Sequence, residues 1–148
     1  MRPAVPDGML GNVPLMQSWV NALALSMAKD IKHTNAWRCE ICSRPSRETK
    51  VDMASWVHLP EPRVVLYIHH LCEAGFNPCH AMIVAQGQIM GNIVGPGLPP
   101  EPWLPKPEGP DHQYPLAASC CGCQKDATAS RKTSMSRCGG CKLVRYCR

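Results

Sequence analysis

Ten cysteines in 148 residues constrain the fold of this chain more than any other feature of its sequence. Six of them form three Cys-x2-Cys pairs, which are Cys39 with Cys42, Cys120 with Cys123, and Cys138 with Cys141. This spacing is typical of a zinc knuckle, a tight turn in which two thiolates bind one tetrahedral zinc ion. The other common use of many cysteines is a disulfide framework in a secreted protein, and the paired spacing favours metal.

The rest of the composition indicates a small hydrophobic core. Fifteen prolines, 11 glycines and a single Phe leave little material for one large domain, so we expect a small, metal-stapled α+β fold. Pro3, Pro6, Asp7 and Pro14 interrupt the apolar residues near the start, which argues against a secretory signal. No segment approaches the roughly 20 apolar residues that span a membrane. We therefore expect an intracellular protein with no membrane partner, in the nucleus or the cytoplasm.

Residues 1–35 are predicted to form a disordered leader, up to residue 12, followed by an amphipathic helix from about residue 13 to residue 32. The apolar residues that recur at three- and four-residue steps are Leu15, Met16, Trp19, Val20, Leu23, Met27 and Ile31. Such a stripe predicts one apolar helix face. We expect this face to pack on the module that follows, and a docking surface for a partner or a membrane is the alternative.

Residues 36–94 are predicted to form a Cys-rich zinc-binding module. After the first knuckle come two candidate strands, residues 56–59 and 63–69, joined across residues 60–62. Asn77 and Pro78 predict the start of a helix that continues to about residue 90, with Asn as the cap and Pro in the first turn. A knuckle, a hairpin and a ligand at a helix N-terminus resemble a treble-clef zinc site. The aromatic residues expected in the core are Trp37, Trp56 and Tyr67.

One zinc site is predicted within this module. Its expected ligands are Cys39, Cys42, Cys72 and Cys79. The positive pole of the predicted helix stabilises a thiolate at Cys79. Six residues separate Cys72 from Cys79, which is not a standard pair spacing, so His69, His70 or His80 is an alternative to one of these two thiols. The soft chemistry of zinc favours the thiols over histidine, and an ordinary buried cysteine is the further alternative.

Residues 95–118 form a proline-rich linker in the sequence. The prolines in this segment are Pro96, Pro99, Pro100, Pro102, Pro105, Pro107, Pro110 and Pro115. Such density favours extended polyproline II and excludes a helix or a central strand, so we interpret the segment as a semi-rigid spacer. The step from Pro102 to Pro105 matches P-x-x-P, which SH3 and WW domains bind, and this is the alternative interpretation.

The tail, residues 119–148, carries the most specific pattern. Its candidate ligands are Cys120, Cys123, Cys138, Cys141 and Cys147. They resemble the first five ligands of a MYND-type zinc finger, and Lys142 and the Tyr146–Cys147 step are also similar to that family. The tail departs from the family in three ways: a longer gap between Cys123 and Cys138, an extra thiol at Cys121, and the absence of the last three ligands.

The resemblance implies an interleaved finger in which the first and third ligand pairs share one zinc and the second and fourth share another. On that scheme Cys147 joins the pair Cys120 and Cys123, while Cys138 and Cys141 form half of the second site, so neither site closes. Two explanations remain open. The four knuckle cysteines can jointly hold one zinc, as in a zinc ribbon or a GATA-like finger, or the finger is truncated.

The resemblance extends more loosely to residues 36–94. Their Trp-x-Cys-x2-Cys start, Trp-x-His-Leu segment and His-x-Cys step resemble a region that precedes the MYND finger in uncharacterised fungal proteins. With the linker, the likeness covers roughly residues 36–148, and it implies no known activity.

The resemblance implies a non-catalytic adaptor whose finger binds proline-rich peptides of protein partners, with Zn²⁺ as the cofactor. Residues 120–148 contain seven Lys and Arg residues against Asp126, a net charge of +6. Binding of nucleic acid by this basic tail is therefore the alternative function. We expect no enzyme, because catalytic zinc needs an open water position beside an acid or base, and the sequence predicts no such pocket.

Overall fold

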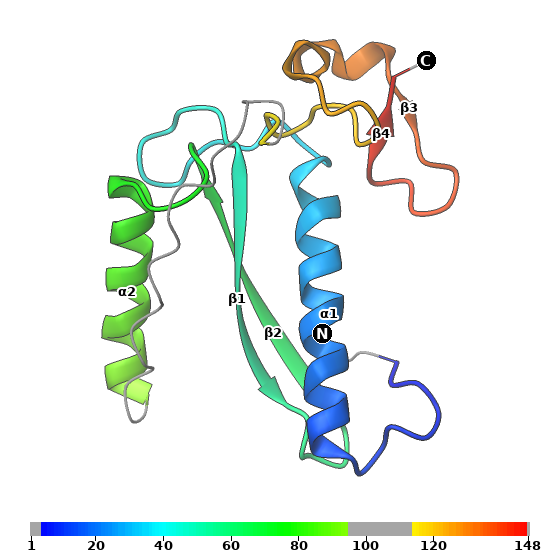
Figure 1. Cartoon of the computed structure of the whole chain (residues 1–148), viewed down its shortest axis with the longest axis vertical. Helices are drawn as coiled ribbons and strands as arrows, with labels where there is room; N and C mark the ends of the chain where they lie inside the picture. The colour runs from blue at the N-terminus through cyan, green and yellow to red at the C-terminus, as the bar shows by residue number, and fades with distance from the viewer. Residues whose placement is uncertain (1–3, 95–113, 148) are drawn as a thin grey trace.

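A computed structural model describes residues 4–94 and 114–147 and shows a small α+β protein (Figure 1). Its elements in chain order are α1 (Val13–Lys32), β1 (Glu48–Trp56), β2 (Arg63–Leu71), α2 (Pro78–Val94), the 3₁₀ helix η2 (Asp126–Ser134), β3 (Ser136–Arg137) and β4 (Arg145–Tyr146). The strands form two separate antiparallel pairs, β1 with β2 and β3 with β4. Most of the proline-rich segment, residues 95–113, lies outside the described residues. None of the described helices is both long enough and apolar enough to cross a membrane.

The first helix, α1, has the bounds that its apolar stripe predicts. Asn12 caps it by accepting a hydrogen bond from the Leu15 N–H at 3.2 Å, and a proline occupies its first turn. Met16 and Val20 on α1 pack against Val57 and Val64 of the hairpin region. The prediction that α1 covers the following module is therefore confirmed.

The prediction of a disordered leader is wrong for part of the described N-terminal segment. Val5 and Met9 pack against the cluster between α1 and the hairpin. The chain reaches that cluster through turns that include Gly8 and Gly11, both with positive φ. Two apolar side chains in a short turn-rich segment give no helical or strand period, so the sequence pattern offered no signal for this packing.

The β1–β2 hairpin differs from the prediction in its first strand. β1 runs from Glu48 to Trp56, with Glu48 opposite Leu71 and Trp56 opposite Arg63. The predicted strand at residues 56–59 instead lies mostly in the turn, while β2 falls where it was expected. The side chains of β1 are all half-buried or exposed. Its sequence therefore shows no regular alternation of apolar and polar residues, and the pattern gives no signal for a strand.

Two of the three aromatic residues predicted for the core are largely exposed. Trp56 is 42% exposed and Tyr67 is 54% exposed. Val64 and Leu66 of β2 pack in the cluster under α1, so Tyr67, in the alternate position, projects from the opposite face. In the view of Figure 1 the hairpin lies between α1 and α2. Trp37 is half-buried, with its ring stacked on His70 at a centroid distance of 4.5 Å.

The second helix, α2, begins where the Asn-Pro step predicts. The Asn77 side-chain oxygen accepts hydrogen bonds from the N–H groups of Cys79 and His80, at 3.0 and 3.1 Å. Its first turns pack Cys79 and Ile83 into a second apolar cluster, whose other buried members are Cys39, Leu71 and Cys72. The core that holds α2 is therefore built largely of cysteine side chains.

The tail contacts the end of α1 and the start of β1 (Figure 1). The backbone N–H of Ala117 donates to the Ser46 carbonyl at 2.8 Å, and that of Ala118 donates to the Lys32 carbonyl at 3.2 Å. The ring of His33, which is 2% exposed, lies 2.9 Å from the Ser119 carbonyl oxygen through Nδ1. This segment leads directly into Cys120, so it fixes where the tail cysteines stand.

Candidate metal centres

The structure brings four sulfur atoms together at one end of the hairpin. We call this group the first cluster, and its members are Cys39, Cys42, Cys72 and Cys79. All four Sγ atoms lie within 4.8 Å of one another, and Cys72 and Cys79 are 3.8 Å apart. Four thiolates bound at about 2.3 Å to a tetrahedral zinc ion lie about 3.8 Å from one another. The arrangement therefore has the spacing of a tetrahedral four-thiolate metal site.

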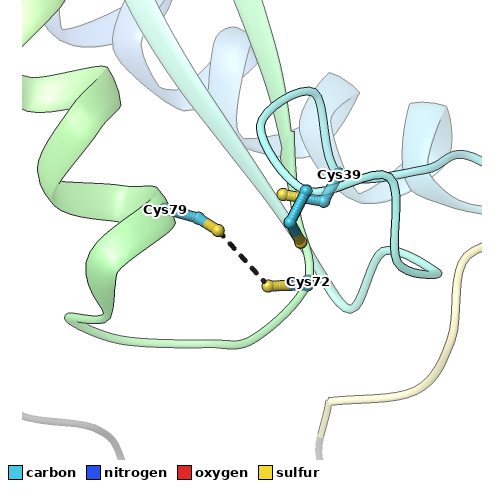
Figure 2. Close-up of side chains that lie close together, drawn as sticks. Cys39, Cys72 and Cys79 are labelled. Atoms are coloured by element: carbon cyan, nitrogen blue, oxygen red, sulfur yellow. Dashed lines mark hydrogen bonds between the residues drawn. The ribbon is translucent and has the colours of Figure 1, made fainter.

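Three separate segments supply these sulfurs. Figure 2 shows Cys72 and Cys79 pointing toward one another, with Cys39 beside them. Cys72 directly follows β2, and Cys79 is in the first turn of α2. Cys39 is in the knuckle, where its N–H donates to the Arg44 carbonyl at 2.8 Å. Since the sulfurs, together with Leu71 and Ile83, form the buried cluster where these segments meet, a bound ion would stabilise the junction directly.

The thiols of the first cluster differ in how readily they ionise. Arg44 donates to the sulfurs of Cys42 and Cys72, at 3.4 and 3.2 Å. The Arg44 hydrogen bond lowers the pKa of Cys42 to about 6, whereas burial raises the pKa of Cys72 to about 12 and also raises that of Cys79. Cys42 thus ionises more readily than Cys72 and Cys79, and a divalent cation would replace the protons of these two buried thiols.

None of the three candidate histidines belongs to the first cluster. His69 pairs with Glu40 at 2.7 Å through Nδ1, and His80 lies 3.1 Å from the Gly75 carbonyl oxygen. His70 stacks on Trp37, and its Nδ1 lies 3.2 Å from the Thr49 hydroxyl. The group that the structure brings together is therefore the predicted set of four cysteines, without a histidine in the place of Cys72 or Cys79.

A second group of sulfurs lies in the tail. We call it the tail cluster, and its members are Cys120, Cys123 and Cys147. Their Sγ atoms also lie within 4.8 Å of one another, with Cys123 and Cys147 3.6 Å apart. Cys120 is 1% exposed, and its sulfur accepts the backbone N–H groups of Cys123 and Cys147 at 3.4 and 3.2 Å. This sulfur is thus the centre of the group.

Backbone hydrogen bonds set the ionisation of the tail cluster. Burial opposes ionisation of Cys120, but the N–H groups of Cys123 and Cys147 outweigh it and lower its pKa to about 6. Side-chain hydrogen bonds with the sulfurs of Cys120 and Cys123 raise the pKa of Cys147 to about 11. The cluster therefore holds one readily formed thiolate with protonated neighbours, and a metal ion can take the place of those protons.

The remaining tail pair, Cys138 and Cys141, forms no group of three or more ligands within the described residues. The proposal that all four knuckle cysteines of the tail share one zinc is therefore not supported by their positions. Backbone N–H groups, chiefly those of Cys141 and Gly140, lower the pKa of Cys138. Cys121 interacts with Tyr146 and lies outside both clusters.

All three knuckles share one backbone conformation. The residue after each second cysteine has a positive φ, namely Ser43 at 60°, Gln124 at 55° and Lys142 at 55°. Each of these residues donates its N–H to the carbonyl of the first cysteine of its pair, at 2.9–3.0 Å. The left-handed conformation is uncommon outside glycine, so its recurrence in three non-glycine residues indicates a common turn that directs two sulfurs to the same side.

The sequence analysis missed two polar groups that support the clusters. Arg44 follows the first knuckle by two residues and contacts two of its sulfurs. Thr128 accepts the Cys120 N–H at 2.8 Å from the 3₁₀ helix η2. An Arg two residues after a Cys-x2-Cys pair is a usable signal, but nothing in the spacing of Thr128 indicates its contact with Cys120.

A cleft of about 280 Å³ lies where the tail meets α1 and β1. Its lining includes Lys32, Arg47, Thr49, Tyr114 and Gln124. Burial lowers the pKa of Lys32 to about 8, against the partial compensation of Glu48. The cleft contains no thiol, so it is separate from both cysteine clusters.

Comparison with protein-family models, with curated proteins and with solved structures gives no significant match to this chain.

Proposed function

We propose that this protein is a zinc-binding, non-catalytic interaction module, and the convergence of four cysteine sulfurs in the first cluster is the observation that carries the proposal. Three of these cysteines, Cys39, Cys72 and Cys79, are at most 7% exposed. Buried thiols are otherwise inert packing residues, but three of them that meet an exposed fourth thiol at a spacing compatible with metal binding, from three segments, indicate a metal site.

Zinc is the metal that best fits this donor set. Thiolates are soft ligands, and a tetrahedral four-sulfur site favours zinc or an iron–sulfur centre. Knuckles with the Cys-x2-Cys spacing are characteristic of structural zinc sites. Four protein ligands leave no open position for a reacting water, which supports a structural role over a catalytic one.

The arrangement of the tail supports a MYND-type finger. Cys147 joins Cys120 and Cys123 across the intervening Cys138–Cys141 knuckle. Such crossing is the interleaved pairing that the resemblance implies, and a ribbon of two consecutive knuckles does not produce it. In this proposal the tail cluster supplies three ligands of one zinc, and Cys138 and Cys141 supply two ligands of another.

A protein partner that presents a proline-rich peptide is part of the same proposal. Leu143 and Tyr146 are 56% and 40% exposed on the finger, close to its metal ligands. Exposed apolar side chains on a small rigid scaffold suit the apolar rings of a polyproline II peptide. The zinc ions would fix the loops that carry these two residues.

Native mass spectrometry of the full chain, expressed with zinc, tests the metal assignment. We expect Cys72→Ser to remove one zinc ion per chain and Cys121→Ser, outside both clusters, to remove none. Equal zinc content in the wild type and Cys72→Ser would overturn the proposed site.

For the partner, we expect a labelled PxLxP peptide to bind the zinc-loaded chain, and binding to weaken in Leu143→Ala but not in Leu25→Ala, an exposed leucine on α1. No binding by the wild type would reject the peptide partner.

Binding of nucleic acid by the tail is the second candidate, and its net charge of +6 is the observation that favours it. Such binding depends steeply on salt, because bound cations are released from the phosphates. We would measure binding of a duplex oligonucleotide across a salt series. Affinity that falls steeply with salt, together with no binding of the peptide, would favour this candidate over the interaction module.

A further inference from the structure

The first cluster has a cationic neighbour that its ligands alone do not require. Arg44 directs Nε to the Cys42 sulfur at 3.4 Å and a terminal nitrogen to the Cys72 sulfur at 3.2 Å. Its other terminal nitrogen pairs with Glu73 at 3.4 Å. One planar guanidinium therefore contacts two sulfurs and a carboxylate that come from both sides of the junction between the knuckle and β2.

The position of Arg44 follows from the knuckle turn. Ser43 has a positive φ, and the Arg44 carbonyl accepts the Cys39 N–H at 2.8 Å. This turn brings the chain back beside the first cysteine, so the side chain that leaves residue 44 lies along the sulfurs. Glu73 directly follows Cys72 and holds the far side of the guanidinium. Lysine cannot reproduce these contacts, because only a planar fork can donate to several acceptors in fixed directions.

The positive charge of Arg44 determines how its contact affects the first cluster. Four thiolates around one Zn²⁺ leave a net charge of −2 on the centre, and hydrogen bonds to coordinating sulfur reduce the electron density available for reaction. Cys42 is the exposed member of the cluster, so it is the sulfur that an electrophile reaches first. Arg44 contacts this sulfur as well as the more buried sulfur of Cys72.

On the basis of the zinc site proposed above, we propose that Arg44 is a positioning and charge-neutralising residue that lowers the reactivity of the first cluster toward electrophiles. It acts on the metal through Cys42 and Cys72. The tail cluster differs, since the donors to its central sulfur, Cys120, are backbone N–H groups and not a basic side chain. The first cluster is thereby protected as a structural centre, and its protection depends on a side chain that a substitution can remove.

Alkylation of the zinc-loaded full chain by iodoacetamide tests this proposal. In each reaction the thiolate lone pair forms an S–C bond, the C–I bond breaks and iodide leaves, with no oxidant needed. Peptide mass spectrometry gives the rate at each cysteine, and a chromogenic chelator reports the zinc released. We expect Arg44→Gln to speed alkylation of Cys42 and Cys72 by about three- to tenfold. Arg44→Lys, which keeps the charge without the fork, should give an intermediate rate.

Arg38 provides a matched control on the same turn. Its side chain donates to the Ser43 carbonyl at 3.0 Å, whereas Arg44 donates to the sulfurs of Cys42 and Cys72. Arg38→Gln should therefore leave the rates at Cys42 and Cys72 unchanged. The rates at Cys123 and Cys147 in the tail should be the same in every variant, which separates a local effect from general loosening of the fold.

A spectroscopic measurement distinguishes charge neutralisation from a purely structural role. With Co²⁺ in place of zinc, loss of the Arg44 hydrogen bonds should move the sulfur-to-cobalt charge-transfer band to lower energy, while the ligand-field bands keep their tetrahedral pattern. Equal alkylation rates in zinc-loaded wild type and Arg44→Gln, together with equal charge-transfer bands in their cobalt forms, would overturn the role of Arg44 and leave the zinc site standing. A wild type with no zinc on the first cluster would overturn the proposed zinc site, and the role of Arg44 with it.

Discussion

The two cysteine clusters of this protein use the same knuckle turn but differ in what surrounds it. The first cluster joins a knuckle, the end of a nine-residue hairpin strand and the first turn of an α-helix. The tail cluster joins a knuckle to Cys147, directly after a two-residue strand, in a region whose only helix is of the 3₁₀ type. Longer elements bury more of their cysteines, and only Cys120 is buried in the tail cluster. A similar local turn can therefore form part of either a buried junction or an exposed finger.

The largest effect expected from this comparison is on α2. Replacing Cys79 by Ser removes a proposed zinc ligand at the point where α2 meets β2, where Ile83 is the other α2 side chain in the buried cluster. We expect zinc to be lost from the first cluster and amide exchange in residues 78–90 to accelerate by about a hundredfold or more. Hydrogen-exchange mass spectrometry measures this, with Cys121→Ser as the control. Unchanged exchange in α2 would show that packing alone holds the helix.

A smaller and more local effect is expected when Cys120 is replaced by Ser. This sulfur is the buried centre of the tail cluster and accepts two backbone N–H groups, so its loss removes the loop contacts and a ligand of the proposed zinc ion. Amide exchange in residues 120–147 should rise by about tenfold, while α1 and the hairpin stay protected by Met16, Val20 and Val64. Loss of protection in α1 would mean that the tail and the N-terminal module unfold together.

The stability of the contact between the tail and α1 is expected to depend on pH through Lys32. Its pKa falls to about 8 in the folded protein, against 10.5 when unfolded, so the unfolded state holds more protons between pH 8 and pH 10.5. Below pH 8 Lys32 is charged in both states, and burial of that charge penalises folding. Wild-type stability should rise between pH 8 and pH 10.5. Lys32→Met removes this dependence and should stabilise the protein at pH 7 by about 1–2 kcal/mol, after allowance for partial solvent exposure.

Urea unfolding of the wild type and Lys32→Met at pH 7, 9 and 10.5 measures this difference. Comparing the two proteins cancels the titration of the thiols, which they share. A stability difference that stays constant across the series would show that burial does not lower the pKa of Lys32.

The smallest effect is expected at the ion pair between Arg47 and Asp126, which are 2.7 Å apart. Burial opposes ionisation of Asp126, but Arg47 and the Leu116 N–H outweigh it and lower its pKa. The stabilisation is therefore present above the usual carboxyl pKa and is lost as the pH falls through the lowered value. Asp126→Asn should cost at most about 1 kcal/mol at pH 7, because the pair is partly exposed. Thermal unfolding checks this, and a larger loss would show that docking of the tail depends on this one pair.

Local chemistry made parts of this structure predictable. The stripe of α1, the Asn-Pro start of α2 and the three Cys-x2-Cys turns depend on contacts between residues close in sequence, so their patterns were visible. β1 was misplaced because its face toward α1 is only half-buried and its residues do not alternate. Trp56 and Tyr67 were expected in the core, but α1 covers one face of the hairpin, and the register placed Tyr67 on the other.

The sequence by itself determined that cysteines dominate this protein and which of them form knuckles, because a knuckle needs only four residues and one left-handed turn. The expected partners of each knuckle were already Cys72 and Cys79 for the first and, from the resemblance, Cys147 for the pair Cys120 and Cys123, but it is the chain path in three dimensions that brings their sulfurs together. Cys72 and Cys79 reach the first knuckle because the hairpin folds back at residues 57–62 and Asn77 caps the next helix. Cys147 meets Cys120 because residues 138–147 return along β3. These encounters depend on chain path and packing over tens of residues, and no local spacing encodes them.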